Sequence, residues 1–407
     1  MADFYDDLET RDAEQRAEAL ETDLPRAISR ARLAPAMARL LRDIDPEAIR
    51  DVAALAQLPV IRKSELSEAQ RKSPPFGGFT TRPATEFDHI FQSPGPIYEP
   101  GRRTGDWWRL GRFLHAAGVG VGDIVQNCFS YHLTPAGMMF DSAARAVDAA
   151  VLPAGTGQTE QQVRAAVDIG STVYAGTPDF LQVILEKADQ MGEALAISRA
   201  CVSGGALFPA MRQSYQDRGI ATFQCYATAD LGLIAYESDA RDGLIVDEGV
   251  IVEIVRPGTG DPVPEGEVGE VLVTTMNVDY PLIRFATGDL SAVMPGQSPC
   301  GRTNMRIRGW MGRADQTTKI KGMFVRPEQV AALVARHPEI ARARVIADRD
   351  GDRDVITVQV ETSAASGDAR SLEQSVQDLL KLRGRVEIVA PGSLPNDGKV
   401  IEDRRSY

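Results

Sequence analysis

The distribution of apolar and polar residues predicts helices first and then an alternation of strands and helices. Residues 11–42 carry apolar positions at helical spacing among Ala, Arg and Glu. Further along, short apolar runs typical of buried strands alternate with helical patterns. The predicted strands are 123–126, 149–152, 172–174, 199–203 and 222–226, and the predicted helices are 104–117, 159–170, 178–191 and 208–218. Thr159 and Gln162 have the spacing of a capping box at the second of these helices. This alternation predicts a parallel sheet with helices on its faces.

The pattern changes after about residue 243. Two apolar runs over 250–255 and 270–275, joined by a connection rich in Gly and Pro, predict paired strands. Beyond residue 315 a third pattern predicts a small α+β domain with strands 342–347, 355–360 and 386–389 and helices starting at 327 and 371. We therefore expect an α/β fold. Its large N-terminal domain, 1–314, would include a β-rich subdomain over about 244–314, and its C-terminal α+β domain would span 315–407.

Composition narrows the class of protein. A chain of 407 residues is too long for one ordinary core, which favours two domains. The net charge of −12 argues against nucleic acid as a general partner. An acidic start without a signal-type apolar core, and no apolar run of membrane-spanning length, predict a cytoplasmic protein without membrane partners. Four cysteines without a CxxC pair fit reduced thiols.

Three short motifs in the C-terminal part contain residues suited to ligand binding or catalysis. Asp289 ends the segment Arg-Phe-Ala-Thr-Gly-Asp, and its carboxylate could accept hydrogen bonds from two ribose hydroxyls. Arg313 and Asp315 lie in Gly-Arg-Ala-Asp, where a planar guanidinium suits ribose or phosphate oxygens. Lys399 ends Leu-Pro-Asn-Asp-Gly-Lys. Taken singly, these residues could equally be a turn carboxylate, a surface ion pair and a solvated lysine.

The order and spacing of these motifs resemble the adenylate-forming ligases, and within them the phenylacetate–coenzyme A ligase family. The resemblance spans nearly the whole chain and is most specific after residue 243. It implies that Asp289 binds the ribose hydroxyls and that Arg313 contacts the nucleotide. It further implies that Asp315 is the hinge of a mobile C-terminal domain. Lys399 would then be the catalytic lysine, because one ammonium offsets the repulsion between a carboxylate and the α-phosphate.

Two predicted strand ends resemble the family's adenine-binding and metal-binding segments. The crevice beyond the carboxyl ends of parallel strands is where α/β sheets bind ligands. The residues concerned are Gly204, Gly205, Ala206, Tyr226, Ala227, Thr228 and Asp230. The resemblance makes Asp230 the ligand of Mg²⁺, which prefers hard oxygen donors. This chain has Ala227 for the family's glycine, Ala229 for its hydroxyl residue and Asp230 for its glutamate. Tight turns and a core tyrosine are the alternative.

The phosphate loop is where the chain departs most from the family. The family reads Ser-Ser-Gly-Thr-Thr-Gly-Lys-Pro, and residues 93–100 here read Ser-Pro-Gly-Pro-Ile-Tyr-Glu-Pro. Ser93 and Gly95 remain as nucleotide-binding candidates. Two prolines remove backbone donors, and Glu99 is expected to place a negative charge where pyrophosphate should lie. We expect this loop to bind pyrophosphate poorly, unless Arg102 and Arg103 compensate.

Two further sets of residues complete the candidate site. Tyr131 and His132 follow the strand at 123–126 and resemble the segment that lines the acyl pocket, with core aromatic residues as the alternative. Lys319, Lys321 and Gly322 follow the hinge motif. Alternation along a strand puts both lysines on one face, where they could meet a coenzyme A phosphate or simply be solvated.

The resemblance implies an AMP-forming acid–coenzyme A ligase. It would use ATP, Mg²⁺ and coenzyme A, release AMP, and act on a small carboxylic acid, by default an aromatic one resembling phenylacetate. A homodimer is compatible with this reading. Two other readings stay open. One is a nucleotide-binding homologue that has lost pyrophosphate chemistry and serves as a sensor or accessory subunit. The other is an adenylating enzyme with a different acceptor.

Overall fold

The computed structural model describes residues 4–314, 318–320, 323–350, 353–362, 369–395, 397 and 399–405. The chain forms two compact units. The first unit comprises Met1–Val252, Val273–Phe285 and Met294–Trp310, and the second comprises Glu253–Leu272, Ala286–Val293 and Met311–Tyr407. The domain boundary expected at Asp315 stays a prediction, because 315–317 lie outside the described residues.

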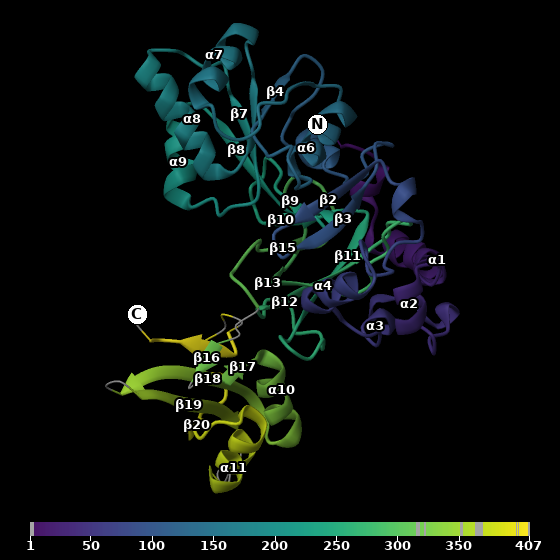
Figure 1. The fold of residues 1–407 in the computed structure, drawn as a ribbon, viewed down its shortest axis with the longest axis vertical. Coiled ribbons are helices and arrows are strands. Elements are labelled where there is room, and N and C mark those ends of the chain that lie inside the picture. Colours follow the sequence, from purple (N-terminus) through teal and green to yellow (C-terminus); the bar gives the residue numbers. More distant parts are fainter. Residues whose placement is uncertain are drawn as a thin grey trace. The chain divides into compact units, whose positions relative to one another are not determined.

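The first unit begins with helices, as the sequence predicts for residues 11–42 (Figure 1). They are η1 (Asp7–Thr10), α1 (Ala13–Ala31), α2 (Pro35–Leu40), η2 (Pro46–Ala48), α3 (Val52–Leu55) and α4 (Lys63–Lys72). Asp12 begins α1 with a capping box to Gln15. Leu24, Ile28 and Ala31 are buried at successive turns of the same helix, so one apolar stripe faces the core.

A nine-stranded sheet dominates the first unit, in the order β14-β15-β10-β9-β8-β7-β6-β4-β5. Its strands are β4 (Ile124–Asn127), β5 (Ala150–Leu152), β6 (Val173–Gly176), β7 (Arg199–Val202), β8 (Ala221–Thr228), β9 (Gly232–Tyr236), β10 (Leu244–Val246), β14 (Val293–Met294) and β15 (Arg306–Ile307). From β4 to β8 every neighbouring pair is parallel, whereas β9, β10 and β15 join antiparallel. The predicted parallel sheet is confirmed.

Helices cover both faces of the parallel strands (Figure 1). They are α5 (Gly111–Ala116), α6 (Ala136–Ala146), α7 (Thr159–Ile169), α8 (Pro178–Met191) and α9 (Pro209–Asp217). Phe113 and Phe140 belong to the core under α5 and α6, while Leu181 and Ile184 belong to a second core under α7 and α8. Burying apolar side chains on both faces explains why these strands read as continuous apolar runs.

Two local expectations at helix starts are wrong. The helix expected from residue 104 begins only at Gly111, with Leu110 before it. Thr159 forms no capping box, because Gln158 is the cap residue and makes no side-chain bond. Gln162 instead points into the core, where its Nε2 donates to the carbonyls of Gly155 and Gly157 at 2.9 and 2.7 Å. Buried polar groups are almost always hydrogen-bonded, and the Gln162 amide forms its bonds to these carbonyls rather than to the backbone at the helix start.

Two smaller sheets are built from strands that precede residue 292. The order β1-β13-β12-β11 joins β1 (Ile61–Arg62), β13 (Phe285–Ser291), β12 (Gly269–Thr275) and β11 (Val250–Val255). The predicted strands over 250–255 and 270–275 are therefore neighbours, as expected. A separate hairpin pairs β2 (His89–Ser93) with β3 (Ile97–Gly101), after the short helix η3 (Ala84–Glu86).

The C-terminal part of the second unit is an α+β fold, as predicted. A four-stranded sheet has the order β20-β19-β18-β21. The sheet consists of β18 (Ile340–Asp350), β19 (Arg353–Thr362), β20 (Arg385–Val389) and β21 (Ile401–Asp403). The same part of the chain contains the helices α10 (Pro327–Arg336) and α11 (Ala369–Leu380), and a separate pair of strands, β16 (Thr318–Ile320) and β17 (Met323–Val325). Val345, Val358, Leu333 and Val376 share one core between this sheet and its two helices.

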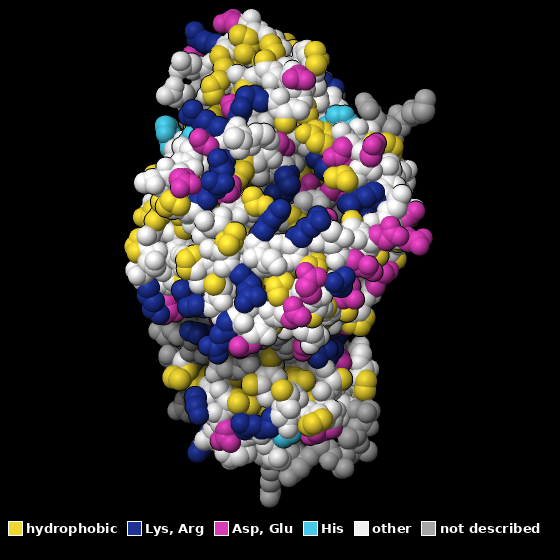
Figure 2. Space-filling view, turned by 90° about the vertical axis from the view of Figure 1, so that its right-hand side faces the viewer, with side chains coloured by type: hydrophobic (Ala, Val, Ile, Leu, Met, Phe, Trp, Pro, Cys, Tyr) yellow, Lys and Arg dark blue, Asp and Glu magenta, His cyan; other side chains and the backbone are white. Residues whose placement is uncertain are grey.

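The surface offers no extended basic region on the face that Figure 2 shows, where Lys and Arg side chains lie among acidic and apolar ones. With a net charge of −12, the chain has to recognise an anionic ligand through individually placed cations. Within the described ranges, no helix combines the length and the apolar character needed to cross a bilayer.

Candidate active site

The turn after β8 carries Asp230 at the carboxyl edge of the parallel strands. The β8–β9 register shifts between Tyr226 and Ala227, which breaks the ladder before the turn. Thr228 Oγ1 accepts a hydrogen bond from Leu231 N at 3.2 Å. Gly232 has a φ of 72°, and a Cβ at this position would lie 2.6 Å from the Trp108 carbonyl oxygen. Glycine is therefore required for the chain to return into β9.

Asp230 forms an ion pair that the sequence did not reveal. Its Oδ2 lies 2.9 Å from Nζ of Lys63, the first residue of α4. The Asp230 side chain is completely buried, whereas the Lys63 side chain is 38% exposed. A buried carboxylate is costly without a partner, so the lysine is what permits this burial. The two residues are 167 positions apart, and a lone lysine at a helix start gives no sequence signal.

Glu99 lies in β3 and is fully buried. Burial, and then the negative charge of Asp230, raise its pKa to about 8, while the charge of Lys63 acts in the opposite direction. At neutral pH Glu99 is therefore mostly protonated. The expectation that it places a negative charge in the phosphate loop is wrong, because desolvation disfavours the charged form.

Tyr280 completes this group, which we call the Lys63 cluster: Lys63, Glu99, Asp230 and Tyr280. Tyr280 is buried, and burial followed by the charges of Asp230 and Glu99 raises the pKa of its hydroxyl well above the ordinary range. With Glu99 protonated, the positive charge of Lys63 balances the negative charge of Asp230. The cluster is then electrically neutral at neutral pH.

The altered phosphate loop is a tight hairpin end. Ser93 pairs with Ile97 across the β2–β3 ladder, so only residues 94–96 form the turn. Two of these residues are prolines and offer no N–H. Gln70 fixes the following strand: its Oε1 accepts from Tyr98 N and its Nε2 donates to the Tyr98 carbonyl, both at 2.8 Å. The loop has few backbone donors for a phosphate, as the sequence indicates.

Arg102 is engaged in an ion pair, and Arg103 lies at the surface. Arg102 Nη1 lies 3.0 Å from Asp279 Oδ2, and Arg82 Nε holds the other oxygen of the same carboxylate at 2.8 Å. Arg103 is exposed, and its N–H donates to Asp88 at 2.9 Å. Lys63, which sequence reasoning missed, is thus the cation that the structure shows in the cluster with Glu99.

The segment proposed as the adenine wall follows β7. Ser203 Oγ donates to the Cys225 carbonyl at 3.1 Å, which ties this segment to β8. Gly204 has a φ of 70°. A Cβ at Gly205 would lie 3.2 Å from Cδ of Pro178. Because β7 and β8 are parallel neighbours, the 203–206 segment and the 226–230 turn emerge at the same sheet edge.

The two acyl-pocket candidates differ in their surroundings. Tyr131 Oη accepts a hydrogen bond from Asn127 Nδ2 at 2.8 Å, and burial raises the pKa of this phenol. Its ring lies against Gly137, where an added Cβ would come within 2.8 Å of the ring carbon Cγ. His132 is exposed, and its N–H donates to Ser130 Oγ. Tyr131 therefore has a fixed position, whereas His132 faces solvent.

Asp289 and Arg313 meet within the second unit. Arg313 Nη1 lies 2.9 Å from Asp289 Oδ1, and the segments carrying them are joined by Leu290 N to the Gly312 carbonyl at 2.9 Å. Gly288 has a φ of 74°, and a Cβ there would approach Arg313 Nη2 to 2.8 Å. Asp289 is buried, while the Arg313 side chain is 54% exposed. The structure thus brings together two residues that the motifs marked independently.

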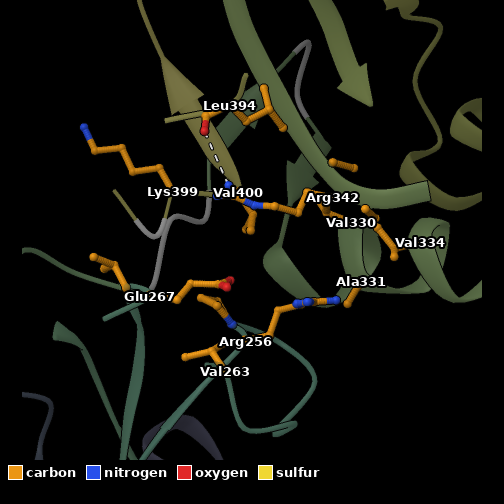
Figure 3. A pocket seen from close by; sticks show the side chains of 14 residues that line it. Arg256, Val263, Glu267, Val330, Ala331, Val334, Arg342, Leu394, Lys399 and Val400 are labelled. Carbon is orange, nitrogen blue, oxygen red and sulfur yellow. Dashed lines mark hydrogen bonds between the residues drawn. The ribbon is translucent and has the colours of Figure 1, made fainter. Parts of the chain in front are cut away.

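Lys399 lies on an exposed segment of the second unit. It borders a pocket lined also by Arg256, Glu267 and Arg342, and its side chain extends away from these residues (Figure 3). Its backbone N–H donates to Asp397 Oδ1 at 3.0 Å, and the Asp397 carboxylate pairs with Arg344 at 2.9 Å. The base of the Lys399 segment is therefore anchored, while the ammonium group is exposed to solvent.

The remaining candidates lie at or beyond the limits of the described chain. Asp315, Lys321 and Gly322 are outside the described residues. Lys319 lies on β16 opposite Phe324, and only its backbone is described.

The Asp230 turn is compatible with a magnesium ion. Asp230 Oδ1 is buried and has no hydrogen-bond partner in the described part of the chain. The same part contains no group of three or more His, Cys, Asp and Glu side chains suited to a metal. Mg²⁺ commonly takes only one or two protein carboxylates and completes its coordination with substrate phosphates and water. A single free carboxylate oxygen fits that use.

Comparison with known proteins identifies relatives over most of the chain, although no family model matches. The chain is 29% identical to phenylacetate-coenzyme A ligase of Thermus thermophilus over 380 residues, which covers 88% of this chain and 84% of the relative. It is 27% identical over 350 residues to the enzyme of the same name from Aromatoleum evansii, covering 82% and 78%.

Solved structures agree at the level of the fold. A structure of 2-hydroxyisobutyryl-CoA ligase in complex with 2-HIB-AMP and CoA superimposes with a TM-score of 0.72 at 23% identity, covering 95% of this chain and 91% of that one. The resemblance noted from the motifs is confirmed by four phenylacetate-coenzyme A ligases at 27–29% identity. The chain is therefore similar to phenylacetate-coenzyme A ligases over most of its length.

Proposed function

We propose that the protein is an AMP-forming carboxylic acid–coenzyme A ligase acting on an aromatic, phenylacetate-like acid or a similar small acid. In the first half-reaction the substrate carboxylate attacks the α-phosphate of ATP, forming an acyl-adenylate and releasing pyrophosphate. In the second, the thiol of coenzyme A attacks the acyl carbonyl, loses its proton and displaces AMP. Splitting acyl activation into two steps is the general logic of covalent intermediates.

The observation that carries this proposal is the ion pair between Lys63 and Asp230. The phosphate loop has lost its lysine, and without another cation the pyrophosphate charge would be unopposed. Lys63 supplies a partly exposed ammonium in the same cluster as Glu99, while protonation of Glu99 removes the repulsion expected there. The cluster therefore compensates for the missing loop lysine and removes the negative charge expected at Glu99. These were the two features that argued most strongly against catalysis.

Each remaining candidate takes one role in this proposal. Asp289 accepts hydrogen bonds from the ribose hydroxyls and Arg313 contacts the nucleotide, with both side chains already fixed against each other. Lys399 neutralises the charge that develops as carboxylate and α-phosphate approach. The segments at the sheet edge bind the adenine and phosphates: Ser93, Gly95, Gly204, Gly205, Ala206, Tyr226, Ala227 and Thr228. Tyr131 and His132 contact the acyl group.

Magnesium, when bound, would neutralise phosphate charge, and Asp230 is the residue that would hold it. The protein's own contribution is to orient the Asp230 carboxylate. Lys63 does this by pairing with one oxygen, which leaves the other oxygen without a protein partner among the described residues.

Domain alternation is the second part of the proposal. A C-terminal domain over 315–407 would turn about Asp315 after adenylation. That movement would withdraw Lys399 and bring Lys319, Lys321 and Gly322 toward coenzyme A. A homodimer and a cytoplasmic location stay predictions, the first checked by light scattering and the second by fractionation.

The main competing function is a nucleotide-binding homologue without catalysis, which the shortage of loop donors favours. ATP–pyrophosphate exchange over a panel of carboxylic acids separates the two. We expect exchange that depends on an aromatic acid, and a coenzyme A thioester as the product once coenzyme A is added. Binding of ATP without exchange for any acid would establish the homologue instead. Exchange without a thioester would identify an enzyme with another acceptor.

A further inference from the structure

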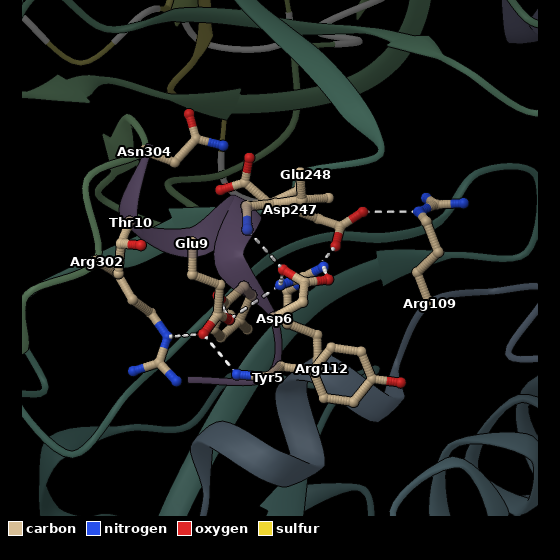
Figure 4. Close-up of polar contacts among 12 residues, drawn as sticks. Tyr5, Asp6, Glu9, Thr10, Arg109, Arg112, Asp247, Glu248, Arg302 and Asn304 are labelled. Atoms are coloured by element: carbon tan, nitrogen blue, oxygen red, sulfur yellow. Dashed lines mark hydrogen bonds and ion pairs between the residues drawn. The ribbon is translucent and has the colours of Figure 1, made fainter. Parts of the chain in front are cut away.

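A buried ionic network fixes the first described residues of the chain to the body of the first unit (Figure 4). Glu9 accepts hydrogen bonds from Tyr236 Oη at 2.7 Å and from Tyr5 N at 3.0 Å, and it pairs with Arg302 Nε at 3.1 Å. Arg112 reaches Glu9 at 3.2 Å. Glu9 and Arg112 are both buried. Removing one member of such a network leaves a buried charge uncompensated, so the arrangement holds its members tightly.

Asp247 connects this network to a second arginine. Arg112 Nε lies 3.4 Å from Asp247 Oδ1, and Arg109 Nε lies 2.6 Å from Asp247 Oδ2. The Asp247 side chain is 1% exposed, and its backbone N–H donates to the Ile234 carbonyl at 2.9 Å. One buried carboxylate thereby sets the position of two guanidinium groups (Figure 4).

Arg109 connects this network to the turn that carries Asp230. Its Nη2 donates to the carbonyls of Leu231 at 2.8 Å and Leu233 at 2.9 Å. These carbonyls flank Gly232, and Leu231 directly follows Asp230. The neighbouring Trp108 carbonyl accepts from Leu233 N at 2.9 Å. Arg109 itself has a φ of 66°, a conformation that non-glycine residues adopt only where their surroundings impose it.

From these contacts we infer that Arg109 is a positioning residue for the nucleotide–magnesium site, acting through the Asp230 turn rather than on the substrate. This rests on the role given to Asp230 in the proposed function. A carboxylate that serves a metal must be held within about half an ångström, and its supporting contacts decide that. Lys63 holds the Asp230 side chain, whereas Arg109 holds the backbone that follows it.

The chain offers a matched control for Arg109. Arg212 also holds one carboxylate, Glu237, at 2.8 Å and one backbone carbonyl, that of Thr222, at 2.9 Å. The two arginine side chains are equally exposed, at 22% and 21%. Asn is the replacement of choice, since it tolerates the left-handed backbone at position 109. R109N and R212N therefore remove comparable guanidinium groups, only one of which touches the Asp230 turn.

The test measures ATP binding by calorimetry with MgCl₂ and without acid, so that no turnover is needed. We expect R109N to weaken binding at least 10-fold and R212N less than 2-fold. In a D230N background R109N should weaken binding less than 2-fold further, because both changes act through one group. R109K, which keeps a positively charged donor group, should recover part of the affinity. Equal losses in R109N and R212N, or an undiminished R109N effect in D230N, would overturn the inference.

A second measurement separates this inference from the proposed function. Backbone hydrogen exchange of the 228–233 segment, without nucleotide, should accelerate at least 10-fold in R109N and stay unchanged in R212N. Wild-type protein that binds no ATP would contradict the proposed function. Even then, hydrogen exchange of the 228–233 segment tests the positioning role. Equal hydrogen exchange in wild type and R109N would overturn that role, and faster hydrogen exchange in R109N would support it.

Discussion

The ammonium group of Lys63 lies 2.9 Å from a carboxylate oxygen of Asp230, although 167 residues separate them in the chain. The acid is completely buried and the lysine remains 38% exposed. The pair therefore combines two functions. It makes the burial of Asp230 tolerable, and it keeps one positive charge accessible in the cluster that contains Glu99.

Removing Lys63 should cost both stability and activity. K63Q leaves the Asp230 carboxylate buried without its cation, which we expect to lower the free energy of unfolding by about 2 kcal/mol. Urea denaturation measures this. K63Q/D230N should be more stable than K63Q alone, because no unpaired charge remains. A double variant no more stable than K63Q would show that the pair does not stabilise the buried acid. Pyrophosphate exchange should fall at least 100-fold in K63Q.

Glu99 should make the stability of the protein depend on pH. Its pKa is about 8 in the folded chain, against an ordinary value of 4.5 that applies on unfolding. Between these values the folded chain holds a proton that the unfolded chain releases. Stability from this group is thus complete below about pH 4.5 and falls by up to ~1.4 kcal/mol per pH unit until about pH 8.

The variant E99Q isolates this effect, since a glutamine stays neutral at every pH. Denaturation at pH 6, 7 and 8.5 should show a shallower decline for E99Q than for wild type. E68Q, which changes an exposed glutamate of α4, is the control and should follow wild type. Exchange activity should also fall above pH 8 in wild type but not in E99Q, because a second carboxylate then ionises beside Asp230. Parallel pH curves for wild type and E99Q would contradict the raised pKa.

The fold was largely predictable because its cues are local. Apolar runs separated by glycines and prolines predict β4 to β8 within a few residues, and repeated strand–helix units have few alternative topologies. The capping box predicted at the start of α7 is wrong for a non-local reason. The Gln162 side chain is buried and donates to the Gly155 carbonyl, so it does not cap the helix.

The candidate site was predictable only where a motif is contiguous. Asp289 and Arg313 belong to two such motifs, and the structure pairs them. Lys63 carries no motif, and its partner is fixed only by the tertiary fold. The charge on Glu99 was misjudged because its pKa depends on burial, which the residue's identity does not reveal.

The contribution of the ribose hydroxyls to ATP binding should depend on Asp289. If its carboxylate accepts from them, wild-type protein should bind 2′,3′-dideoxy-ATP about 10-fold to 100-fold more weakly than ATP, as expected for hydrogen bonds to a charged acceptor. In D289N the ratio of the dissociation constants for 2′,3′-dideoxy-ATP and ATP should fall toward 1, because the variant has already lost most of the interaction with the ribose hydroxyls. Calorimetric titration of both nucleotides measures the ratio. An unchanged ratio in D289N would remove Asp289 from the ribose site, whatever happens to the absolute affinities.

Lys399 should matter for adenylation and not for thioester formation. Its ammonium group is exposed in this structure, and Asp397 and Arg344 anchor the segment that carries it. K399A should therefore fold normally yet lose pyrophosphate exchange by about 100-fold to 1,000-fold, because its ammonium group is the cation assigned to the approach of the acid to the α-phosphate.

The same K399A protein should convert a presynthesised acyl-adenylate and coenzyme A to the thioester within 3-fold of the wild-type rate. That step requires no cation between two anions, since the acyl group is already activated. K381A, which removes another exposed lysine of the same unit, serves as the control and should leave both half-reactions unchanged. Equal losses in the two half-reactions of K399A would indicate a structural role for the lysine, and exchange retained in K399A would refute its role in adenylation.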